Sequence, residues 1–329
     1  MTGGAYYRPI PQPEGGRWRL AGGWTFFTRL ERLERGRAPQ IVDEAPPEVI
    51  AALTAPRPPV LRLSMDAPRS MGIVNATPDS FSDGGAYDPV GHVRQLVAEG
   101  AEILDIGGES TRPGAAEVAV ADELDRILPA IRTGAALAPV SVDTRKAAVA
   151  GPELNAGAGL VNDVSGFDFD PVLPAMVAAH GVPVCLMHAQ GLPDTMQDDP
   201  RYDDVLLDVY DALEARVARA EAAGIPRLRI VIDPGIGFGK TEAHNLAILR
   251  RISLYHGLGC AILLGVSRKR FIGNIGGAPA PAERVPGTLA LSLMAVQQGV
   301  QIHRVHDVAA HVQALRLWRA VANNEKAEG

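Results

Sequence analysis

Short apolar runs alternate with longer amphipathic stretches along most of the chain. The runs are rich in Val, Ile and Leu, as expected for strands that are covered on both faces. They comprise eight segments: Met71–Val74, Ile103–Ile106, Val140–Val142, Leu160–Val161, Val182–Met187, Ile230–Ile232, Ala261–Leu264 and Gln301–Val305. The stretches between them have the apolar period of helices. These predicted helices are Ala119–Ile131, Asp170–His180, Asp203–Ala223, His244–Ile252, Thr288–Gln298 and Asp307–Ala322.

Eight strands that alternate with helices over roughly 250 residues have the size and pattern of a (β/α)8 TIM barrel of the α/β class. The alternative is an open, doubly wound sheet. The glycine-rich stretch that follows Ile232 lacks the features of a nucleotide-binding sheet. Lys240 stands where a dinucleotide fingerprint needs its last Gly, and Pro234 stands where a Walker A loop needs its first. The sequence therefore favours the barrel.

Residues 1–58 differ from the rest in being rich in proline and in holding two of the three tryptophans. We expect them to form an N-terminal extension, partly packed, ahead of a catalytic barrel domain at 59–325. Arg17–Leu20 and Trp24–Thr28 predict an N-terminal hairpin, and Pro46–Leu53 predicts a short helix. Val60–Leu63 predicts a further strand, followed by a turn that leads into the barrel.

Four large aromatic side chains lie close together in this extension. If all were exposed, they would form a sticky patch. We therefore expect them to pack against the barrel or against a partner chain; they are Trp18, Trp24, Phe26 and Phe27.

Composition narrows the class of protein. A net charge of −6 and a pI of about 5.8 argue against a nucleic-acid partner. The chain has neither an 18-residue apolar stretch nor a signal peptide, so we expect no membrane span and a cytoplasmic location. Cys185 and Cys260 lie far apart in apolar runs, which is typical of buried thiols rather than of a disulfide or a metal site.

Each predicted strand ends in polar residues. In a (β/α)8 barrel all strand ends face one mouth, where the active site lies. The polar residues therefore form one candidate constellation: Asn75, Asp105, Asp143, Asn162, Asp233, Lys269, Arg304 and His306. The alternative for individual members is a structural role. Asp233 could cap the turn that follows it, and Asp163 and Asp307 are the best candidates for helix caps.

The constellation combines two kinds of chemistry. Asp143, Asn162 and Asp233 offer two carboxylates and an amide, which suit the amino and ring N–H edge of a flat heterocycle. The second set offers donors for an anion such as a phosphate: Thr111, Lys269, Arg304 and His306.

Asn75 and Asp105 supply hard oxygen ligands that could help to hold Mg²⁺ on a diphosphate. His188 follows another strand and could line the pocket, but a structural core histidine is the favoured interpretation.

Eight segments in order match a known family: MGIVNATPDSFSDGG (71–85), ILDIGGESTRPGA (103–115), SVDTRK (141–146), VNDVSG (161–166), MH (187–188), DPGIGFGK (233–240), GVSRKRFIG (265–273) and RVHDV (304–308). Through them the span from about Met71 to Val321 resembles the bacterial dihydropteroate synthases, a family of pterin-binding TIM barrels. These transferases join 6-hydroxymethyl-7,8-dihydropterin diphosphate to p-aminobenzoate. They release 7,8-dihydropteroate and diphosphate in folate synthesis, and they are sulfonamide targets.

The resemblance implies a role for each matching residue. The pterin ligands would be Asp143, Asn162, Asp233 and Lys269. The diphosphate ligands would be Thr111, Arg304, His306 and, through Mg²⁺ as its metal ligand, Asn75. The p-aminobenzoate pocket would comprise Thr111, Arg112, Pro113, Phe238, Ser267 and Lys269. The catalytic set would be Asp143, Asp233, Lys269, Arg304 and His306.

Two other functions fit the same fold. One is a methyltetrahydrofolate:corrinoid-type methyltransferase, and the other is a non-catalytic pterin-binding protein. The intact run Ser267-Arg268-Lys269, together with Arg304 and His306, argues against both, because neither function needs a diphosphate site. The resemblance also implies a homodimer.

Overall fold

A closed barrel of eight parallel strands forms the centre of the protein. The computed structural model describes residues 4–76, 88–110, 117–191 and 198–322. The strands follow one another around the barrel in sequence order, and β13 pairs with β6 to close it. Their bounds are β6 Arg69–Asn75, β7 Ile103–Gly107, β8 Val140–Asp143, β9 Leu160–Asp163, β10 Val184–Met187, β11 Ile230–Asp233, β12 Ala261–Leu264 and β13 Ile302–Val305. The predicted barrel is thus confirmed, and the open sheet is wrong.

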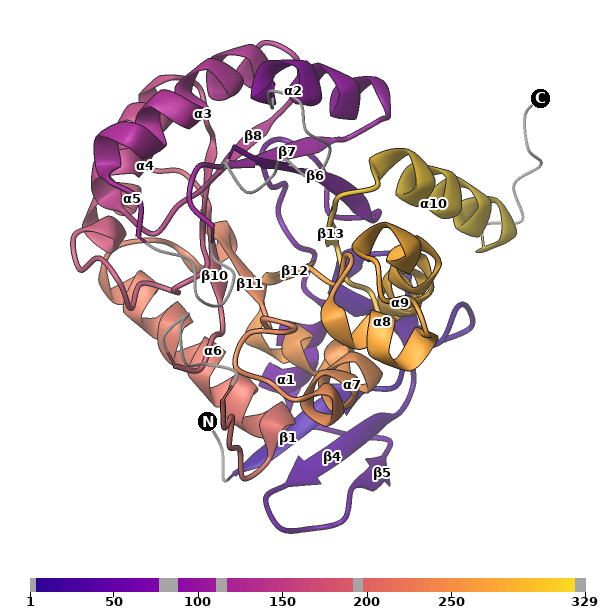
Figure 1. Cartoon of the computed structure of the whole chain (residues 1–329). Coiled ribbons are helices and arrows are strands. Elements are labelled where there is room, and N and C mark those ends of the chain that lie inside the picture. Colours follow the sequence, from indigo (N-terminus) through magenta and orange to yellow (C-terminus); the bar gives the residue numbers. More distant parts are fainter. Residues whose placement is uncertain (1–3, 77–87, 111–116, 192–197, 323–329) are drawn as a thin grey trace.

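Helices surround the strands on the outside, as Figure 1 shows. The barrel helices are α2 Pro89–Ala98, α3 Val120–Ala135, α4 Ala147–Asn155, α5 Leu173–His180, α6 Val205–Ala222, α7 Glu242–Arg250, α8 Arg270–Gly276, α9 Val285–Gln297 and α10 Val308–Ala322. Short 3₁₀ turns η3 (Arg227–Arg229), η4 (Ile252–Leu258) and η5 (Pro281–Arg284) connect some of them. In the described part of the chain, no helix combines the length and apolarity needed to cross a membrane.

An inner apolar layer fills the end of the barrel where the strands begin. Met71, Ile103 and Ile302 belong to it, and Val60 and Leu63 pack against them from the preceding segment. The prediction of a strand at Val60–Leu63 was wrong. This segment is a tight turn with one isolated bridge between Val60 and Leu63, and its central residues have left-handed backbone. Its apolar residues close the barrel as a plug instead of forming a strand.

The extension folds into a small substructure beside the barrel (Figure 1). The predicted hairpin is present as β2 (Trp18–Arg19) paired with β3 (Phe26–Phe27), with η1 (Leu20–Gly22) between them, and the predicted helix is α1 (Pro47–Thr54). A three-stranded antiparallel sheet was not predicted. It consists of β1 (Ala5–Pro9), β4 (Leu30–Glu34) and β5 (Gln40–Val42).

The aromatic side chains of the extension are packed in two places. The Trp24 Nε1 donates to the Val296 carbonyl at 2.8 Å, and the Trp24 ring meets Trp318 edge-on, so this residue docks on the barrel. Phe27 is completely buried within the extension, where the Trp18 ring lies 5.3 Å from it. The expected packing against the barrel is therefore confirmed for Trp24, whereas Trp18 and Phe27 pack on each other.

Arg57 joins the end of the extension to the barrel. Its buried guanidinium donates to the carbonyl groups of Cys260 at 3.0 Å, His256 at 2.8 Å and Ala52 at 3.1 Å. Burial lowers the pKa of Arg57 to about 10. The buried His256 ring also shares a hydrogen bond with the Gln298 carbonyl, so this histidine has a structural role.

If the extension is an integral part of the fold, truncating its core should destabilise the protein. Phe27→Ala should lower the free energy of unfolding by about 3–5 kcal/mol, the usual cost of removing a buried aromatic ring. Ile41→Ala is the matched control, because Ile41 lies in the same extension but is 55% exposed. Urea denaturation of both variants is the measurement. Equal stabilities for the two would contradict the packing described.

Candidate active site

The polar strand ends lie together at one end of the barrel. Because all eight strands are parallel, Asn75, Asp143, Asn162 and Asp233 share its carboxyl end. Lys269 and His306 lie in the loops that leave β12 and β13 on the same side. The prediction that these residues lie together at one mouth of the barrel is confirmed.

Arg304 is the central cation of the mouth. Its Nε lies 2.5 Å from one Asp105 oxygen, and its Nη2 lies 2.7 Å from an Asp143 oxygen. The Asn162 amide donates to the same Asp105 oxygen at 3.1 Å. Asp143 was predicted to bind the pterin, and Arg304 was predicted to bind the diphosphate. These two residues are in direct contact, so the two predicted sets of ligands adjoin each other.

The buried charges of this group influence one another. The pKa of Asp143 is raised to about 7, chiefly by burial; the charge of Arg304 opposes this rise, and the nearby Asp105 adds to it. Burial alone would lower the pKa of Arg304, but Asp105 and Asp143 outweigh it, so that pKa is raised. Arg304 thus stays charged and favours the carboxylate form of Asp143.

Asp233 begins the glycine-rich loop after β11. One of its carboxylate oxygens accepts the Gly235 N–H at 2.7 Å, so the capping interpretation is correct for that oxygen. Burial raises the pKa of Asp233, against the hydrogen bond from Gly235 and the charge of Lys269. The cap fixes the orientation of the carboxylate at the mouth.

The glycines of this loop are required by close contacts. Gly235 has φ of 68°, and a Cβ there would lie 1.8 Å from the His188 carbonyl oxygen. Gly237 has φ of 82°, and its Cβ would lie 3.2 Å from the Lys269 side chain. At Gly235 a side chain would not fit, whereas at Gly237 the left-handed backbone is the main constraint.

Lys240 is a structural member of the site that the sequence reasoning missed. Its buried ammonium donates to the carbonyl groups of Gly235 at 2.9 Å and Phe238 at 3.0 Å. It also lies 2.8 Å from the His188 Nδ1. Burial lowers the pKa of Lys240 to about 7 and that of His188 to about 2. His188 is thus a neutral structural histidine, and the loop is wound around Lys240.

The other side of the mouth is formed by the loops after β12 and β13. The Lys269 ammonium lies 4.1 Å from the centre of the Phe238 ring, a cation–π contact. The His306 N–H donates to the Ser267 hydroxyl at 3.1 Å, and the His306 Nδ1 lies 3.0 Å from the same oxygen. These contacts bring four predicted site residues into two neighbouring pairs.

The two proposed capping residues behave differently. Asp163 accepts the backbone N–H of Ser165 at 2.8 Å and of Phe167 at 2.6 Å, so it caps the turn after β9 and not a helix as predicted. Asp307 forms an ion pair with Arg268, whose two nitrogens lie 2.9 and 2.5 Å from its oxygens.

Three predicted site residues, Thr111, Arg112 and Pro113, lie outside the described residues. The chain on either side of them is anchored at Glu109. This carboxylate accepts the Val118 N–H at 3.1 Å and pairs with Arg145 at 3.1 Å. Burial raises the pKa of Glu109, but Arg145 and the Val118 N–H outweigh that effect and lower it overall.

A magnesium ion would find only partial protein coordination here. Among the described residues no group of three or more His, Cys, Asp or Glu side chains could hold a metal ion. Asn75 contributes an amide oxygen at the end of β6. Magnesium commonly binds through one or two protein oxygens together with substrate phosphates and water, so this donor set fits an ion that arrives with a diphosphate.

Comparison with known proteins agrees with the site. Residues 71–306 match the family described as pterin binding enzyme. The chain is 45% identical over 267 residues to the dihydropteroate synthase of Escherichia coli (strain K12), covering 78% of this chain and 93% of the relative. It is 42% identical to that of Bacillus subtilis (strain 168), covering 77% and 88%.

Solved structures agree as well. The Xanthomonas albilineans dihydropteroate synthase with 4-aminobenzoic acid is similar with a TM-score of 0.74 and 48% identity, over 79% of this chain and 94% of that one. The Yersinia pestis dihydropteroate synthase with a sulfonamide drug complex gives 0.76 and 43%, over 79% and 96%.

The fold, the mouth and these relatives define a pterin-binding barrel enzyme. Within that class, the chain belongs to the dihydropteroate synthase family. Members of this family are transferases, and the resemblance read from the eight sequence segments is confirmed.

The glycine contacts give a prediction about the loop. Gly235→Ala should lower the free energy of unfolding by about 2 kcal/mol or more, because the left-handed backbone is strained and the new Cβ meets a backbone carbonyl. Gly151→Ala, inside α4 with no atom near its Cβ, is the matched control and should be neutral or stabilising. Thermal unfolding compares them. A Gly235→Ala protein as stable as wild type would show that the loop is not packed in this way.

Proposed function

We propose that this chain joins 6-hydroxymethyl-7,8-dihydropterin diphosphate to p-aminobenzoate, giving 7,8-dihydropteroate and diphosphate in folate synthesis. The observation that carries the proposal is the pair of buried carboxylates, Asp143 and Asp233, at the same mouth as Arg304 and Lys269. Acceptors for a pterin edge thus lie beside cations for an anionic leaving group. The Xanthomonas albilineans relative has been solved in complex with 7,8-dihydropteroate.

In this proposal Asp143, Asn162 and Asp233 bind the pterin. The two carboxylates accept its amino and ring N–H groups, and a carboxylate can accept two such donors in parallel. Lys269 completes this set from the loop after β12. The buried position of the carboxylates strengthens these hydrogen bonds, because little water competes for them.

The diphosphate group lies on the side of Arg304 and His306, with Thr111 as a further donor. Asn75 would help to hold a Mg²⁺ ion, which would supply positive charge to neutralise the leaving group. Arg304 also forms ion pairs with Asp105 and Asp143. It would therefore stabilise the leaving diphosphate and remain the counterion of these two carboxylates.

The p-aminobenzoate site is formed by the Phe238 ring and the Lys269 chain on one side and by Ser267 below them. Thr111, Arg112 and Pro113 belong to this set by resemblance. The aromatic ring suits the face of Phe238, and Lys269 and Ser267 suit the carboxylate.

The reaction requires bond cleavage at the pterin methylene carbon. The C–O bond breaks with its electron pair on the diphosphate, whose negative charge Arg304 and His306 stabilise. The remaining cation is delocalised into the pterin ring beside Asp143 and Asp233. The amine nitrogen of p-aminobenzoate then forms the C–N bond and loses a proton to water. No covalent enzyme intermediate is needed.

Asp233→Asn tests the pterin half of this mechanism. It keeps an acceptor for the Gly235 N–H but removes the negative charge, so product formation should fall roughly 30- to 1000-fold, the equivalent of about 2–4 kcal/mol. Product and diphosphate release are measured with Mg²⁺ and both substrates.

Calorimetric binding of diphosphate with Mg²⁺ is the control, and Asp233→Asn should leave it nearly unchanged. A wild-type protein that released no diphosphate, or that instead transferred a methyl group to a corrinoid, would contradict the proposed function. Binding of the pterin without turnover would favour the non-catalytic alternative.

The proposal extends to assembly as a homodimer through the outer side of α9 and α10. Both helices carry exposed apolar residues: Pro286, Ala290, Met294, Leu317 and Val321. α9 and α10 are packed side by side, and apolar surface of this kind is typical of subunit contacts. The proposed compartment is the cytoplasm, where the two buried, unpaired cysteines would stay reduced.

Leu317→Glu should therefore shift the protein from dimer to monomer in sedimentation analysis. Leu228→Glu is the matched control, because Leu228 is 64% exposed and Leu317 is 65% exposed, but Leu228 lies in η3, away from α9 and α10. If the wild-type protein is monomeric, or if both variants remain dimeric, the proposed interface is wrong.

A further inference from the structure

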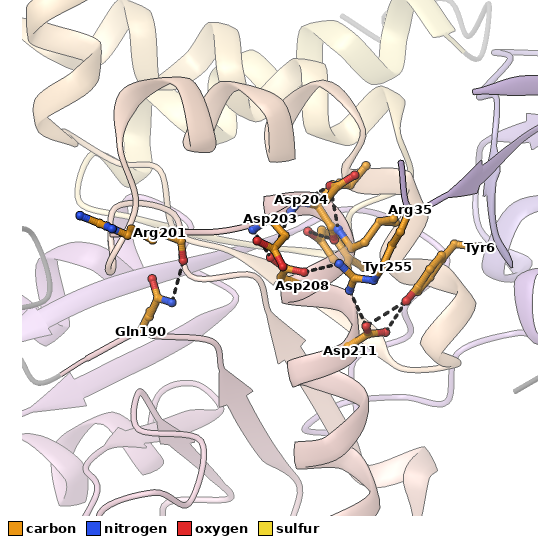
Figure 2. A network of polar contacts seen from close by, with 11 residues as sticks. Tyr6, Arg35, Gln190, Arg201, Asp203, Asp204, Asp208, Asp211 and Tyr255 are labelled. Atoms are coloured by element: carbon orange, nitrogen blue, oxygen red, sulfur yellow. Dashed lines mark hydrogen bonds and ion pairs between the residues drawn. The ribbon is translucent and has the colours of Figure 1, made fainter. Parts of the chain in front are cut away.

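The extension is bonded to the start of α6 by an ionic cluster, which Figure 2 shows. Arg35, in the turn after β4, lies 2.5 Å from Asp208 and 2.7 Å from Asp211. The hydroxyl of Tyr6, in β1, donates to Asp211 at 2.9 Å. Two strands of the extension thus hold one helix of the barrel near its amino end.

Asp208 transmits this contact to the chain that enters α6. One of its oxygens pairs with Arg35, and the other accepts the backbone N–H groups of Asp203 at 3.0 Å and Asp204 at 3.2 Å. Asp204 in turn caps α6 through the N–H groups of its first turn. A single carboxylate therefore fixes both the extension and the segment before the helix (Figure 2).

Tyr202 lies directly before this fixed segment and contacts the glycine-rich loop. Its hydroxyl donates to the Gly239 carbonyl at 2.7 Å, and its ring meets the His244 ring edge-on at 5.0 Å. Gly239 follows Phe238, the residue whose ring lies against Lys269. Tyr202 therefore contacts the backbone next to Phe238 and helps to fix its position.

Tyr202 is half-buried, with one side packed against the core and the other facing a cavity. A cavity of about 790 Å³ borders it, with the remaining lining supplied by Asp203, Asp208, His244 and neighbouring residues. On the cavity side the hydrogen bond of Tyr202 to Gly239 and the bonds of Asp208 to the segment that follows add to this packing. The distant contact of Arg35 with Asp208 becomes important for that reason.

We propose that the N-terminal extension positions the p-aminobenzoate wall of the active site, through Arg35, Asp208 and Tyr202. Tyr202 is a positioning residue: it holds the Gly239 carbonyl and thereby the Phe238 ring, without touching the substrate. The inference rests on the proposed function of the site. It assigns to the extension, which lies outside the region matched by the pterin-binding family, a part in substrate binding.

Tyr202→Phe tests the last contact, since it removes the hydroxyl and keeps the ring. The KM for p-aminobenzoate should rise roughly 3- to 10-fold, as expected for one lost hydrogen bond, while the KM for the pterin diphosphate stays within about twofold. Hydrogen exchange at the amides of residues 235–239 should become faster in the ligand-free variant. A purely structural role would lower the melting temperature without this selective change in KM.

Arg35→Gln tests the first contact, and it should raise the same KM in the same direction. Arg251→Gln is the matched control. Arg251 also pairs with the extension, at 3.0 Å from Glu31, but its contact does not lead to Tyr202. This control should lower the melting temperature while leaving the contacts of Arg35 and the KM for p-aminobenzoate unchanged.

The double variant Arg35→Gln/Tyr202→Phe decides whether the residues act as a unit. Its KM for p-aminobenzoate should be close to that of Tyr202→Phe alone, because the two changes break the same chain of contacts. Multiplicative effects, or unchanged loop exchange in Tyr202→Phe, would overturn the inference. Hydrogen exchange needs no substrate, so it tests the coupling even if the wild-type protein fails to make dihydropteroate.

Discussion

The guanidinium of Arg304 lies between two buried carboxylates, and the rest of the mouth depends on that contact. Arg304 belongs to the last strand of the barrel, whereas Asp105 and Asp143 belong to β7 and β8. The ion pairs therefore cross the mouth near the seam where β13 closes the barrel on β6. Burying a carboxylate without a partner charge lowers the stability of the fold, so a pocket with two buried carboxylates needs a cation beside them.

The same contact joins the two halves of the proposed chemistry. Burial raises the pKa of Asp143 to about 7, so its folded state binds a proton more tightly than its unfolded state. By linkage, the contribution of Asp143 to the free energy of unfolding falls as pH rises from about 4 through 7. Burial thus disfavours the ionised carboxylate, which is the form proposed to bind the pterin. Arg304 counteracts this effect. Arg304 is therefore proposed to act on both sides: it binds the diphosphate, and it keeps Asp143 ionised for the pterin.

Much of this could be predicted from the sequence, because strand ends of a parallel barrel must converge. The strand periodicity located Asn75, Asp143, Asn162 and Asp233 at one mouth. Lys240 was missed because its structural role depends on three loop carbonyl groups, which come together only in the folded chain. The contact of Tyr6 with Asp211 spans 205 positions, and no local pattern indicates it. Local pattern was also misleading at Val60–Leu63, where a short apolar run forms a plug and not a strand.

Binding of a pterin that carries no diphosphate tests the central role of Arg304 most directly. Calorimetry of wild type and Arg304→Gln at pH 7, in two buffers of different ionisation enthalpy, gives both the affinity and the protons released. Loss of Arg304 should raise the pKa of Asp143 further, so binding should weaken roughly tenfold per pKa unit and more protons should be released. Equal affinity and equal proton release in the two proteins would contradict the account.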